Sequence, residues 1–201
     1  MESMEDRILA SAEQLFLERG FDGTSMSDIA AKAGINRPTL HYYFRTKDKM
    51  FRAVLSRIVL SFVPRVYDII VQSEKPVAER VSEVLDAYMV IFMNKPCLPL
   101  FVAREIQRDF DFLVRMMRQE QIDRYAHKII CALQTEMDGG RLRKVPLRSL
   151  FYTFYGLLVF PFLTRHLTEA LLLKEGESFK DMLVEWKKHV VSQMCAFLLE
   201  K

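Results

Sequence analysis

Cysteine, glycine and proline are all scarce in this 201-residue chain, which has three cysteines, seven glycines and seven prolines. The three cysteines, Cys97, Cys131 and Cys195, lie far apart and form no C-x-x-C pair. This spacing predicts neither a disulfide framework nor a zinc site. We therefore expect reduced thiols, as in cytoplasmic proteins.

Long apolar runs are missing as well. The longest uncharged stretch, Ser149 to Thr164, has 16 residues and contains Gly156 and Pro161, whereas a membrane-spanning helix needs about 20 apolar residues. The N-terminal stretch MESMEDRILA is acidic and helical in pattern, unlike a signal peptide. We expect a cytoplasmic protein that does not enter a membrane.

The sequence also has no recognisable catalytic motif. Its four histidines show no metal-ligand spacing, and H-E-x-x-H, a glycine-rich phosphate loop and G-x-S-x-G do not occur. We expect no enzyme, no cofactor and no metal. The formal net charge of +3 is too small for a general polyanion binder, so any basic surface must be local.

What the sequence does have is helical periodicity along nearly its whole length, without the alternation typical of strands. It predicts an all-α fold of about nine helices. Pro64 and Pro161 are expected to bend or divide the helices that contain them. The expected helices run from the N-terminus to Gly20, from residue 47 through the bend at Pro64, and over residues 26–33, 36–44, 76–94, 98–107, 110–137, 147–167 and 179–199.

The composition changes near position 50, where short helices with strong N-caps give way to long apolar helices. This change predicts two domains, residues 1–50 and 51–201. In the first domain, Ser25 with Asp28 three residues later is a capping box. Gly34 ends that helix and Asn36 opens the next one. Two short capped helices joined by a tight turn are the pattern of a helix-turn-helix.

Charge is strongly divided within this first part of the chain. Residues 32–52 contain six basic residues and one acidic residue, a net charge of +5, whereas residues 1–31 have a net charge of −5. A basic patch around a short second helix is the electrostatic feature expected of a nucleic-acid-binding surface.

The stretch FDGTSMSDIAAKAGINRPTLHYYFRTKDKMFRAVL resembles the N-terminal DNA-binding segment of TetR-type transcriptional regulators. The resemblance covers roughly residues 5 to 55, and the length and all-helical remainder of the chain agree with that family. The matching positions are Gly20-Phe21, Thr24-Ser25, Asp28-Ile29-Ala30, Ala33-Gly34, Thr39-Leu40, Tyr42-Tyr43-Phe44 and Lys47.

The resemblance implies two kinds of DNA contact, to base edges and to phosphates. His41 replaces the aromatic residue, usually tyrosine, that the family has at this position. Ile29, Ala33, Ile35, Leu40 and Phe44 would lock the two helices together. The base-edge residues would be Asn36, Arg37, Thr39 and His41. The phosphate-binding residues would be Thr24, Ser25, Ser27, Tyr42, Tyr43 and Lys47.

The resemblance also implies a homodimer and a small-molecule pocket in the second domain. The alternative is that these apolar stripes at helical spacing form the plain core of a monomer. The dimer interface would comprise Phe151, Phe154, Tyr155, Leu158, Phe179, Leu183, Trp186 and Val190. The pocket would comprise Tyr88, Phe92, Phe101, Arg104, Met116, Tyr125 and His127.

The resulting functional prediction is a ligand-responsive repressor. It would bind a palindromic double-stranded DNA operator as a homodimer and be released by a small, apolar effector. The alternative is a helical protein of the same fold that senses a ligand or partner without binding DNA. The sequence leaves open the operator, the effector, the regulated genes and the choice between repression and activation.

Overall fold

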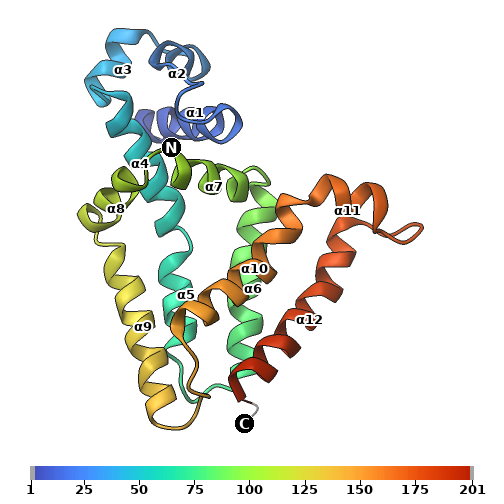
Figure 1. Ribbon diagram of the computed structural model, residues 1–201. Helices are drawn as coiled ribbons and strands as arrows, with labels where there is room; N and C mark the ends of the chain where they lie inside the picture. The colour runs from blue at the N-terminus through green and yellow to red at the C-terminus, as the bar shows by residue number, and fades with distance from the viewer. Residues whose placement is uncertain (1–2, 200–201) are drawn as a thin grey trace. The chain divides into compact units, whose positions relative to one another are not determined.

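The computed structural model describes residues 3–199, which form helices and connecting turns (Figure 1). The all-α prediction is confirmed. The expected number of about nine helices was wrong, because three of the predicted helices are each divided in two. The twelve helices in this range are α1 (Met4–Arg19), α2 (Met26–Lys32), α3 (Arg37–Tyr43), α4 (Lys47–Leu60), α5 (Val63–Ile70), α6 (Val77–Asn94), α7 (Leu98–Arg108), α8 (Phe110–Gln119), α9 (Asp123–Asp138), α10 (Leu147–Leu163), α11 (Arg165–Leu171) and α12 (Phe179–Leu199).

Two of the divisions have a local cause. Pro64 lies in the first turn of α5, where a missing backbone N–H costs nothing because that group has no partner within the helix. It therefore starts a new helix instead of bending α4. Gln121 has a φ of 58°, in the left-handed region, and this backbone conformation separates α8 from α9.

The third division does not fall where the sequence predicts it. Pro161 lies inside α10, and the helix continues to Leu163 before breaking at Thr164. Proline cannot donate a hydrogen bond to the carbonyl of Leu157, four residues earlier. The indole Nε1 of Trp186, on α12, donates to that oxygen instead at 2.9 Å. The replacement bond accounts for a helix that passes through its proline.

The chain divides into two compact units. Unit 1 comprises the residues up to Ser61 together with Leu100–Asp123, and unit 2 comprises Phe62–Pro99 together with the residues from Arg124 onward. Unit 1 is therefore discontinuous in sequence, because it includes most of α7 and all of α8. The functional division into residues 1–50 and 51–201 stays a prediction.

The core of unit 1 is built around aromatic rings. The predicted apolar face of α1 is buried, and its Phe16 meets Phe51 of α4 edge to face at 4.9 Å between ring centroids. Gly20 has a φ of 74°, which glycine adopts readily, and the chain folds back so that Phe21 stacks on Phe16. Phe101 of α7 also packs its ring against Phe51.

Unit 2 is organised around α6, which packs along α12 and α5. A buried ion pair joins α6 to α9: the guanidinium of Arg80 donates to both carboxylate oxygens of Glu136, each at 2.7 Å. Arg80 also donates to the carbonyl of Ile70, at the end of α5, at 2.8 Å. One buried side chain thus connects three helices.

No single helix within residues 3–199 combines the length and apolar composition needed to cross a membrane. Two pairs of consecutive helices meet that criterion only when taken together across a sharp bend.

Candidate nucleic-acid interface

The helix-turn-helix predicted between Ser25 and Phe44 is present as α2, a tight turn and α3. The hydroxyl of Ser25 accepts from the backbone N–H of Asp28, and the Asp28 carboxylate accepts from the N–H of Ser25, which completes the capping box. Gly34 has a φ of 65°, and the N–H of Ile35 closes the turn on the carbonyl of Ala30 at 3.0 Å. The side chain of Asn36 then caps α3.

The residues predicted to lock α2 against α3 do so. Ile29, Ala33, Leu40 and Phe44 are buried, and Ile35 is half-buried. Because these apolar side chains face inward, the remaining positions of α3 face solvent.

The four predicted base-edge residues lie together at α3. Asn36, Arg37 and His41 are exposed, and Thr39 is half-buried. The amide oxygen of Asn36 accepts from the backbone N–H of Thr39 at 2.8 Å. Its amide N–H groups are left as donors, so capping the helix does not use up the hydrogen-bonding capacity of Asn36.

The three residues predicted to present hydroxyls to phosphate at the start of α2 differ in their exposure. Thr24 is only 1% exposed, and its Oγ1 lies 2.9 Å from the carbonyl oxygen of Gly20 and 3.2 Å from that of Leu15. The prediction that its hydroxyl faces a phosphate was therefore wrong, because that hydroxyl bonds inside the fold. Ser25 is exposed but engaged in the capping box. Ser27 is exposed.

Two aromatic rings project from the end of α3. Tyr42 is 83% exposed and Tyr43 39%, and their rings meet edge to face with centroids 5.3 Å apart. The half-buried Lys47, at the start of α4, donates from Nζ to the carbonyl of Thr24 at 3.0 Å and lies over the ring of Phe21. A lysine ammonium has three N–H donors, so the bond to Thr24 orients the group and leaves two free.

The basic patch is not neutralised within the protein. Its members in residues 32–52 take part in no ion pair within the described part of the chain, and most are exposed. A positive surface without internal counter-charges remains available to an external polyanion. The members are Lys32, Arg37, Arg45, Lys47, Lys49 and Arg52.

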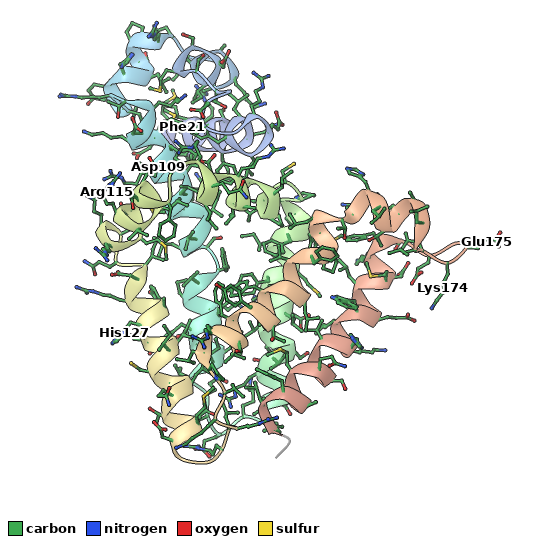
Figure 2. All side chains as sticks on the ribbon, in the orientation of Figure 1. Phe21, Asp109, Arg115, His127, Lys174 and Glu175 are labelled. Carbon is green, nitrogen blue, oxygen red and sulfur yellow. The ribbon has the colours of Figure 1, made fainter. Side chains whose placement is uncertain are left out.

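Two residues of α7 that the sequence did not predict contact Phe21, in the loop before the helix-turn-helix. The buried carboxylate of Glu105, on α7, accepts from the N–H of Phe21 at 3.5 Å and from Nε of Arg108 at 2.6 Å. The Arg108 guanidinium lies over the ring of Phe21, 4.2 Å from its centroid. Phe21 thus lies beside α7 (Figure 2). No local pattern signals these contacts, because Phe21 and Glu105 are 84 positions apart.

The residues predicted to line a pocket are not brought together in one unit. Phe101 and Met116 belong to the core of unit 1, where Met116 accepts a hydrogen bond from Ser56. Arg104 is exposed. In unit 2, Tyr88 and Phe92 are buried with their rings 5.9 Å apart. Also in unit 2, the half-buried Tyr125 packs on Tyr67 and the exposed His127 on α9 lies 3.6 Å from the thiol of Cys131 (Figure 2).

The predicted dimer interface needs a larger correction. Phe179, Leu183 and Val190 are buried inside unit 2, because the regular stripe of α12 faces its own unit, chiefly α6. Leu158, on α10, is buried as well. These four residues close the monomer core. Phe154, Tyr155 and Trp186 are half-buried, and only Phe151 is exposed. The exposed apolar side chains of α10 and α12 are instead Phe151, Tyr152, Phe160, Leu163, Val184 and Leu199.

A capped helix-turn-helix with an unpaired basic surface, joined to a larger helical unit, defines a DNA-binding regulator. The comparisons with known proteins agree. Residues 8–54 match the family model described as bacterial regulatory proteins, tetR family. The chain is 24% identical over 136 residues to the HTH-type transcriptional repressor NemR of Escherichia coli, an alignment that covers 68% of each chain.

Similarity also extends over most of the chain. The chain is 24% identical over 183 residues to YttP of Bacillus subtilis, which is described as a probable HTH-type transcriptional regulator. This alignment covers 88% of this chain and 86% of YttP. The transcriptional regulator FadR from Bacillus subtilis, solved with stearoyl-CoA, has the same fold, with a TM-score of 0.71 at 15% identity over 95% of this chain and 97% of FadR. Residues 8–54 thus match the DNA-binding segment of TetR-type regulators, and the chain as a whole is similar to members of that family.

Proposed function

We propose that this protein is a repressor that binds a palindromic operator as a homodimer and is released by a small apolar effector. The observation that carries the proposal is the exposed, unpaired basic surface around α3. Arg37 and His41 would contact base edges in the major groove, where a bidentate arginine selects guanine. Tyr42, Tyr43 and Lys47 would contact phosphates and fix the register.

The homodimer is supported by an exposed apolar stripe on α10. Tyr152, Gly156, Phe160 and Leu163 recur at helical spacing on one face, and Phe160 is 63% exposed. A Cβ at Gly156 would meet no heavy atom within 4 Å, so a helix of a second copy has room to approach there. Pairing two helix-turn-helix units would match the two half-sites of a palindrome.

The dimer is tested by Phe160→Glu, which places a charge on this stripe. We expect monomers in sedimentation and the loss of tight operator binding. Val90→Glu is the matched control, because Val90 is a comparably exposed apolar residue on α6, away from the stripe. Dimers that persist in Phe160→Glu would contradict this assignment.

The effector is expected to bind in unit 2, whose interior is rich in aromatic side chains. FadR was solved with stearoyl-CoA, which has a long apolar chain, and this supports an apolar effector for the present protein. Helix α4 begins at Lys47, beside the DNA-reading helix, and leads through Ser61 and Phe62 directly into unit 2. Coupling of about 1–3 kcal/mol along this connection would change operator affinity roughly 5- to 150-fold.

The DNA-binding proposal is tested by titrating salt against binding to the region upstream of the protein's own coding sequence. If the dimer neutralises about six phosphates, log affinity should fall with log salt at a slope near −5. Arg37→Ala should relax discrimination at one base position by roughly 1–3 kcal/mol, whereas Arg65→Ala, an exposed arginine on α5, should change little. Binding that is absent or independent of salt would refute the proposal.

A further inference from the structure

Two tyrosines in unit 2 share a hydrogen bond within an aromatic cluster. The hydroxyl oxygens of Tyr88, on α6, and Tyr155, on α10, lie 2.5 Å apart. Tyr88 is 6% exposed, and burial raises the pKa of its hydroxyl well above the ordinary value and also raises the pKa of Tyr155. Tyr88 is therefore shielded from water, whereas Tyr155 is half-buried.

The surroundings of the pair are apolar rings. Phe62 and Phe154 lie 5.1 and 6.2 Å from Tyr88 between ring centroids, and Phe151 lies 4.6 Å from Tyr155. Within residues 3–199, neither hydroxyl has another hydrogen-bond partner, and no lysine, arginine or histidine side chain donates to them. The two hydroxyl groups are thus polar groups surrounded by aromatic rings.

Counting protons shows that the pair is incomplete. Two phenols carry two O–H donors, and their mutual bond uses one of them, whichever residue donates. One O–H is left over, and a donor that is shielded from water and has no acceptor is unfavourable. The hydroxyl that accepts within the pair is also the stronger donor toward a third group, because hydrogen bonds in a chain polarise one another.

We propose that Tyr88 and Tyr155 are the polar anchor of the effector site, and that the effector is an uncharged apolar molecule with a carbonyl oxygen. The carbonyl accepts the remaining O–H, and the aromatic rings cover the apolar body. A carboxylate fits less well, because no cation stands at the pair to compensate its charge on burial. This inference rests on the proposed effector control and adds the chemical class of the ligand.

The test compares three probes with one apolar body: 2-acetylnaphthalene, 2-ethylnaphthalene and 2-naphthoate. Calorimetry without DNA gives their affinities, so the result is independent of operator binding. We expect the ketone to bind about tenfold more tightly than the hydrocarbon, the ratio expected for one net hydrogen bond, and more tightly than the carboxylate. The longer pair 2-undecanone and undecane provides a second apolar body.

The double variant Tyr88→Phe/Tyr155→Phe keeps both rings and removes both hydroxyls, a change that is close to neutral for folding when both partners are replaced. It should bind ketone and hydrocarbon equally. Tyr152→Phe is the matched control, because Tyr152 lies on the same helix and is 71% exposed; it should keep the tenfold ratio. Circular dichroism confirms that each variant is folded.

Three results would overturn the inference: no binding of either ketone, equal binding of ketone and hydrocarbon by the unmodified protein, or a ketone preference that survives in the double variant. Tightest binding of 2-naphthoate would overturn the assignment to a neutral ligand. Loss of operator binding with the ketone preference intact would refute the repressor function alone, so the two failures are distinguishable.

Discussion

Trp186 and Pro161 should be energetically coupled, because the indole replaces the helix hydrogen bond that proline cannot make. In Trp186→Phe, the half-buried carbonyl of Leu157 loses its donor, which costs about 1–3 kcal/mol beyond the effect of the smaller ring. In Pro161→Ala, the new backbone N–H can bond to that same carbonyl. In the Pro161→Ala background, Trp186→Phe should then lower the free energy of unfolding only by the effect of the smaller ring.

A double-mutant cycle therefore predicts a coupling free energy of at least about 1 kcal/mol. Far-ultraviolet circular dichroism during urea unfolding is the appropriate assay, because Trp186 is the only tryptophan in the chain and its replacement removes the fluorescence signal. In thermal unfolding, 1 kcal/mol corresponds to a shift of roughly 2–4 °C for a chain of this size. Additivity of the two single changes within about 0.5 kcal/mol would refute the replacement.

Three other changes probe the scaffold of the two units. Glu136→Ala leaves the buried guanidinium of Arg80 unpaired and should lower the free energy of unfolding by about 3–5 kcal/mol, whereas replacing both residues by apolar ones should cost much less; urea titration measures both. Gly34→Ala has space for its Cβ but a φ of 65°, so we expect a cost of about 1–2 kcal/mol from the backbone alone, and an unchanged melting temperature would contradict it. The hydrogen bonds from Ser25 lower the pKa of Asp28 below its ordinary 3.8, so its stabilisation is present above pH 3.8 and lost as the pH falls through the lowered value; Asp28→Asn should show a weaker loss of thermal stability on acidification.

The DNA-reading part of the molecule was largely predictable because its determinants are local. Capping boxes, turn glycines and apolar spacing act within a few residues, and the structure confirms the caps at Ser25 and Asn36. The error at Thr24 has a different origin. The sequence shows a polar side chain at a helix start, but it does not show that the folded chain brings the carbonyls of Gly20 and Leu15 to the hydroxyl of Thr24.

The second half of the chain was less predictable because its helices are apolar on more than one face. Periodicity shows that Leu183 and Val190 share a stripe of α12 but not whether that stripe meets a partner or its own unit. The exposure of Phe160 and Tyr152 could not be predicted from the sequence either, because nearly every position of α10 is apolar and no one face stands out. Long-range contacts such as Glu105 with Phe21 have no local signature at all.

The inclusion of most of α7 and all of α8 in unit 1 has a consequence for exchanging parts between this protein and the regulators it resembles. A hybrid that takes only residues 1–50 from this protein would keep Phe21 but lose Glu105, Arg108 and the ring of Phe101. The helix-turn-helix segment of such a hybrid would then pack against residues of the other protein. A functional hybrid should therefore take residues 100–123 from this protein together with its N-terminal segment, because the two segments form one compact unit.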